Sequence, residues 1–109
     1  KALKKYRIGD MKTIYDKQGY SLFHWSCGQS DIPLTKFLLD NGFDINQRDY
    51  FGMNGLHWAV MSESRDIVEY LLSRGIKWNV EDLYGVTPFF IAEGMKDIEE
   101  CMKKYGVKE

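Results

Sequence analysis

Apolar side chains recur at helical spacing along the chain, and short polar segments separate them. Leu34, Phe37 and Leu38 occupy the i, i+3 and i+4 positions that share one face of a helix, and they are expected to face the core. The same spacing returns 33 residues later. A glycine follows each of these stretches, Gly42 the first and Gly75 the second, as is common after the last turn of a helix. The pattern predicts an all-α chain of short helices in repeated pairs.

The repetition has a fixed period. Gly19, Gly52 and Gly85 lie 33 residues apart, and each is the last residue of a four-residue block that begins with aspartate. His24 and His57 keep the same separation. Self-similarity at a period of this length indicates a solenoid of stacked helical units, an architecture that usually presents an extended binding surface.

Each unit is predicted to run turn, helix, turn, helix. Phe23, Trp25 and Cys27 are expected on the apolar side of the first helix. Segments 43–46 and 76–79 are too short for a helix and should form the extended arms of hairpin-like loops. The expected helices are 21–28 and 33–41, then 54–60 and 66–75, then one that begins at Thr87 and one over 98–105. Ser21, Asn54 and Thr87 are the expected capping residues of the first helices.

The third unit departs from the pattern, because two residues are missing between its helices and Phe90 stands where the second unit has His57. A terminal unit needs a polar outer face, so this unit is expected to be a C-terminal cap. Residues 1–109 are expected to form a single domain. Its predicted parts are an N-terminal helical cap over 1–15, repeats over 16–48 and 49–81, and a shortened capping repeat over 82–109.

These units resemble those of ankyrin repeat proteins. The resemblance covers nearly the whole chain and implies an all-α ankyrin solenoid of about three repeats. It also implies that another protein binds at the hairpin tips and on the exposed side of each first helix. Gly55 departs from the family pattern, which has proline there. The matching motifs are Phe23-His24-Trp25-Ser26, Leu56-His57-Trp58-Ala59, Leu71-Leu72-Ser73-Arg74-Gly75 and Thr87-Pro88.

A second, weaker resemblance concerns the parent protein. The histidine and tryptophan motifs, together with the short final repeat, are similar to the ankyrin tail of acyl-CoA-binding-domain proteins. In those proteins a separate N-terminal helical bundle binds the fatty acyl-CoA, and no such bundle precedes the repeats here. This resemblance implies an accessory tail in a longer chain, and the lack of an initial Met also suggests a larger protein.

The composition of the chain limits the classes of partner and the cellular locations to expect. The net charge of −1 gives no global reason to expect nucleic acid. Residues 1–17 are locally basic, as in a solvated helix face or a site for an anionic lipid or an acidic partner. No apolar stretch approaches the roughly 20 residues that span a bilayer. With only Cys27 and Cys101, no disulfide framework is expected, and we expect a cytoplasmic monomer, with the nucleus as the alternative location.

The residues that suggest chemistry recur once per repeat. Asp16, Asp49 and Asp82 are expected to belong to turns, where each carboxylate accepts nearby backbone N–H groups. His24 and His57 each follow a helix-capping position by three residues, where an imidazole can hydrogen-bond back to the turn. Zinc ligation by the pair is disfavoured, because stacked helices lie about 10 Å apart and zinc–nitrogen bonds measure about 2.1 Å. Buried packing is expected for both cysteines. We therefore expect no enzyme activity and no cofactor.

The hairpin tips give the stronger indication of a binding site, since two of the three are unusually apolar for water-exposed loops. Tyr50, Phe51, Met53, Leu83 and Tyr84 are the expected anchors of a partner protein. Two alternatives stay open, one in which these side chains pack on neighbouring tips and one in which the domain is a spacer. Trp25 and Trp58 are expected either in packing between repeats or on the concave face. The remaining candidates for partner contact are Tyr20, Gln29, Arg48, Met61, Glu81 and Val86, with Arg48, Gln29 and Glu81 at the rim.

Overall fold

The computed structural model describes residues 21–108, and this part of the chain is helical, with no β-strand element. The all-α prediction is confirmed. The expected N-terminal cap, the basic segment and Tyr20 lie outside the described residues. The helices are α2 (Leu22–Gly28), α3 (Ile32–Asp40), α4 (Gly55–Met61), α5 (Arg65–Ser73), α6 (Pro88–Ile91) and α7 (Lys96–Lys104).

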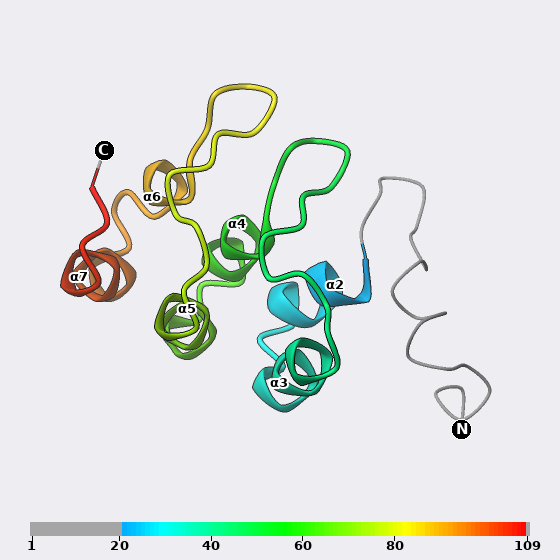
Figure 1. Ribbon diagram of the computed structural model, residues 1–109. Helices are drawn as coiled ribbons and strands as arrows, with labels where there is room; N and C mark the ends of the chain where they lie inside the picture. The colour runs from blue at the N-terminus through cyan, green and yellow to red at the C-terminus, as the bar shows by residue number, and fades with distance from the viewer. Residues whose placement is uncertain (1–20, 109) are drawn as a thin grey trace.

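The helices form two rows. The row of first helices contains α2, α4 and α6, and the row of second helices contains α3, α5 and α7 (Figure 1). Neighbours pack along each row, α4 lying against both α2 and α6 and α5 against both α3 and α7. Loops 43–54 and 76–87 project from the same side of the stack (Figure 1). This is the solenoid that the period predicts.

Local sequence explains where the first helices begin. Ser21 caps α2 and Asn54 caps α4, and in both helices the histidine three residues later completes a capping box with the backbone of the cap residue. Thr87 caps α6 and is followed by Pro88 at the first helical position. The three capping residues named by the sequence are therefore confirmed.

The last repeat shows where its two missing residues are lost. Helix α6 has four residues, whereas α4 has seven. The deletion thus removes the last turn of the first helix and leaves the second helix intact. Helix α7 begins at Lys96, two residues before the predicted start. The boundaries proposed for the four parts of the domain stay predictions.

The core lies between the two rows. Leu38, Leu56, Ile67 and Leu71 are fully buried there, and the small residue Ala59 is buried where the helices approach. Burial of a side chain of this size contributes roughly 1.5–3 kcal/mol relative to exposure. Hydrophobic packing between repeats therefore stabilises helices that are too short to be stable alone.

Two expected core residues are exposed. Trp25 is 59% exposed, although Phe23 and Cys27 on either side of it are buried. Residues two apart on a helix point about 200° apart, so Trp25 lies opposite its apolar neighbours. Phe37 is 44% exposed, because the buried face of α3 is centred on Thr35 and Leu38. The prediction that Phe37 faces the core was therefore wrong. The placement of Trp25 on the apolar side of its helix was wrong too, whereas its expected alternative, the concave face, is compatible with exposure.

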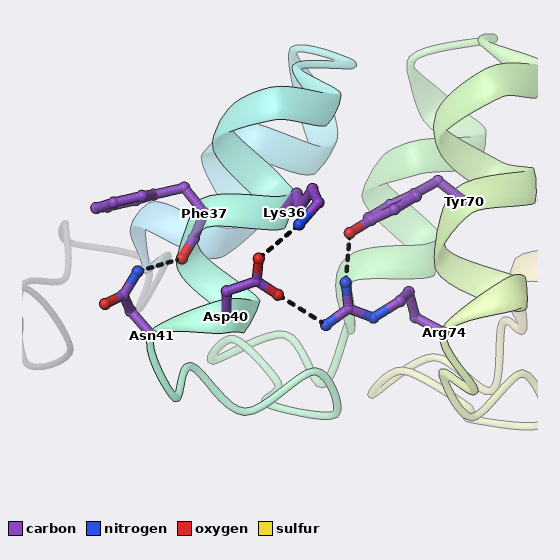
Figure 2. A network of polar contacts seen from close by, with 6 residues as sticks. All are labelled: Lys36, Phe37, Asp40, Asn41, Tyr70 and Arg74. Carbon is purple, nitrogen blue, oxygen red and sulfur yellow. Dashed lines mark hydrogen bonds and ion pairs between the residues drawn. The ribbon is translucent and has the colours of Figure 1, made fainter.

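Polar contacts join the second helices at their surface. Arg74 follows the last residue of α5, and its Nη2 lies 3.4 Å from Asp40 Oδ1 of α3 (Figure 2). Its Nη1 donates a hydrogen bond to the Tyr70 hydroxyl at 2.6 Å. Lys104 of α7 pairs with Glu69 of α5 at 3.1 Å. Exposed ion pairs contribute about 0–1 kcal/mol each, so these contacts add little to the packing beneath them.

Candidate interaction surface

Two hairpin loops carry most of the predicted partner residues. We name residues 49–53 the second tip and residues 82–86 the third tip. The aspartate that opens each tip also closes it, because Asp49 Oδ1 accepts the backbone N–H of Met53 and Asp82 Oδ1 accepts that of Val86, both at 2.9 Å. The predicted turn role of these aspartates is confirmed. Asp16 lies outside the part of the chain that the structure describes.

Three large apolar side chains of the tips face solvent. Tyr50 is 71% exposed, Leu83 70% and Tyr84 80%. Since Tyr50 and Leu83 occupy equivalent positions one period apart, successive tips present successive members of a single row. We call these three residues the tip surface. The other two predicted anchors, Phe51 and Met53, are half-buried, and so is the further candidate Val86.

Arg48 and Glu81, expected at the rim, are exposed residues at the bases of the two tips. The Arg48 guanidinium is already engaged within the protein. Its Nε donates to the Gly52 carbonyl at 2.9 Å, and its Nη2 donates to the backbone carbonyl of Glu81. The side chain therefore bridges the second tip and the strand-like arm that leads into the third.

The first helices add fewer exposed apolar groups. Met61 is exposed at the end of α4, and Gln29 is exposed just after α2. Trp25 of α2 is exposed as well and was missing from the predicted partner residues. Its spacing of two residues from Phe23 would have identified it. Trp58 is half-buried and donates its indole N–H to Asp49 Oδ2 at 3.0 Å.

His57 is a structural residue that joins two repeats. Its Nδ1 accepts the backbone N–H of Asn54 at 3.1 Å, and its Nε2 lies 2.9 Å from the carbonyl oxygen of Val86 in the third tip. Both contacts are hydrogen bonds when the neutral ring carries its proton on Nε2. His24 makes the corresponding contact to its cap residue, with Ser21 N–H 3.1 Å from Nδ1. The predicted turn-fixing role is confirmed for both.

The environment of His57 predicts sensitivity to acid. Burial lowers the pKa of His57 below its usual 6.5, and the hydrogen bond to Val86 opposes this only in part. In the unfolded chain the imidazole takes up a proton as the pH falls through about 6.5, whereas the folded protein resists protonation. The contribution of His57 to the free energy of unfolding is thus complete above that pH, and it is progressively lost as the pH falls below it. We expect His57 to contribute a loss of at most about 1.4 kcal/mol per pH unit.

Chemical denaturation at pH 7.5 and 5.5 measures this effect. His57→Gln is the comparison, because its amide cannot take up a proton in this range. The wild type should lose more unfolding free energy than the variant between the two pH values. Equal losses in both proteins would show that His57 does not titrate differently on folding.

Both cysteines lie in the part of the chain that the structure describes, and both are buried. Burial raises the pKa of Cys27 to about 12, so its thiol stays protonated at neutral pH. Within residues 21–108, no group of three or more histidine, cysteine, aspartate and glutamate side chains is placed to hold a metal ion. Nor does this part of the chain include a helix long and apolar enough to cross a membrane.

Comparison with known proteins agrees with the architecture. The family model described as ankyrin repeats (3 copies) matches residues 1–82 of the 109. No curated protein matches the chain. The resemblance to the tail of acyl-CoA-binding-domain proteins gains no support from these findings. Ankyrin repeats are generally protein–protein interaction modules and typically have no enzymatic activity. Because the family model matches most of its length and its helices stack in pairs, this chain belongs to the ankyrin repeat family.

Proposed function

We propose that this domain binds another protein through the tip surface, with Tyr50, Leu83 and Tyr84 as the anchors. The observation that carries the proposal is their exposure, at least 70% each, on adjacent hairpin loops. Burial of large apolar side chains on binding provides most of the affinity of a typical interface, and tyrosine is enriched among its strongest contacts.

The residues around the anchors support a surface larger than the tips alone. Met61, Gln29 and Trp25 are exposed at the first helices, where a partner seated on the tips would also reach the concave side. Glu81 offers a carboxylate at the base of the third tip. Polar rim groups of this kind contribute more to specificity than to affinity. We propose that the partner meets this surface in the cytosol or the nucleus.

The double variant Tyr50→Ala with Tyr84→Ala tests the proposal. Partner capture by the immobilised domain should fall at least about tenfold, because loss of each hot-spot ring commonly costs more than 1 kcal/mol of binding energy. Helical content should be unchanged, since both rings lie outside the core. The measurement is quantitative mass spectrometry of proteins captured from a cell extract, with circular dichroism of each variant.

The matched control is Tyr105→Ala, which removes an exposed tyrosine from the end of α7 in the other row of helices. Proteins lost with the double variant but retained with this control depend on the tips. Capture of the same proteins at wild-type strength by the double variant would rule out the tip surface.

A further inference from the structure

We propose that Arg48 is a positioning residue, which holds the second and third tips as one unit and does not meet the partner through its charge. This role of Arg48 rests on the proposed function only where binding of a partner is measured. It revises the rim role expected for Arg48, because the guanidinium is engaged with the protein's own backbone.

Hydrogen bonds join the two hairpin loops at the tips and at their bases. Arg48 donates from Nε to Gly52 O at 2.9 Å and from Nη2 to Glu81 O, so a single planar group binds both loops. The backbone N–H of Leu83 donates to Phe51 O at 2.9 Å, directly from the third tip to the second. A partner anchored on both tips therefore meets side chains whose separation is already fixed.

The loops also touch without a side chain between them. A Cβ atom at Gly52 would lie 3.2 Å from Leu83 N, 3.2 Å from Asp82 Cα and 3.2 Å from Arg48 Nη2. At the equivalent Gly85, with the same φ of +80°, the nearest such atom is 3.9 Å away. Gly52 thus serves two purposes, the left-handed turn and the close approach of the tips, whereas Gly85 serves the turn alone.

The hydrogen bonding of the third tip favours recognition by side chains. Its five backbone N–H groups all donate within the protein, to Val86 O, Phe51 O, Asp82 O and the Asp82 carboxylate. A partner strand that paired with this loop would find no donor available, so strand addition is excluded here. Affinity then depends on how well the exposed rings are placed before binding, and a rigid arrangement lowers the entropic cost of association.

Amide hydrogen exchange tests the link without a partner. In Arg48→Ala and Arg48→Lys, exchange at the Leu83 amide should become at least about tenfold faster, because lysine keeps the charge but cannot bind both loops with one planar group. Exchange should stay within twofold of wild type at the Val86 amide, which bonds inside the third tip, and at Leu71 in α5. Gly52→Ala offers a second route to the same opening, since its methyl group separates the loops.

Unchanged exchange at Leu83 in both arginine variants and in Gly52→Ala would overturn the proposal. The binding measurement separates positioning from charge. Positioning predicts that Arg48→Lys and Arg48→Ala both weaken capture of the tip-dependent proteins, whereas a charge contact predicts wild-type capture by Arg48→Lys alone, and that result would also overturn it. If wild-type domain captures no tip-dependent protein, the proposed function fails, and the exchange result still decides whether Arg48 joins the tips.

Discussion

Replacement of His57 by alanine should lower the free energy of unfolding by about 3 kcal/mol, a large part of the roughly 5–15 kcal/mol that stabilises a typical domain. The imidazole is fully buried and makes two hydrogen bonds that no neighbouring group replaces. Truncation leaves the Asn54 N–H without its acceptor in the interior and opens a cavity between repeats. It also removes the contact that joins α4 to the third tip.

Urea denaturation monitored by circular dichroism measures the change. Phe90→Ala is the matched control, because Phe90 occupies the equivalent position of the last repeat and is 64% exposed. Because most of its ring faces solvent, its removal should cost less than about 1 kcal/mol. Similar losses in the two variants would mean that His57 contributes little beyond the local turn.

The second large effect is expected at Gly55, where alanine should destabilise the protein by about 2–3 kcal/mol. Gly55 begins α4, and a Cβ atom there would lie 2.7 Å from Phe23 Cε2 and 3.0 Å from Cys27 Sγ of α2. Both of these residues are fully buried, so the clash cannot be relieved toward solvent. The family pattern has proline at this position, and the buried ring of Phe23 occupies the space that a larger residue would need.

Gly28→Ala is the matched control, since it places the same methyl group on a helix at an ordinary distance of 3.7 Å from the Trp58 ring. It should be neutral or stabilising by up to about 1 kcal/mol, because alanine restricts the unfolded chain more than glycine does. Thermal unfolding of both variants provides the comparison. A further variant, Phe23→Leu combined with Gly55→Ala, should recover part of the loss, because the smaller side chain makes room for the methyl group. No recovery would show that the Phe23 contact is not the cause.

The candidate surface was only partly readable from sequence. The period placed Tyr50, Leu83 and Tyr84 on loop tips, and all three are exposed. The same reasoning put Phe51 among the anchors, yet its side chain is half-buried. Its carbonyl oxygen accepts a hydrogen bond from the backbone N–H of Leu83 in the third tip. For Trp25 the sequence left packing between repeats and the concave face open, because the apolar character of its neighbours concealed its position on the opposite side of α2.

By itself the sequence determined the helix pairs, their capping residues and the aspartate turns. Each of these depends on groups within about four residues of one another, so spacing along the chain is enough to specify it. Only the tertiary structure decided how much of each tip faces solvent, that Arg48 binds a carbonyl 33 residues away, and that Gly55 has no room for a methyl group. Those properties depend on how closely neighbouring repeats approach, which follows from the volumes of side chains distant in sequence.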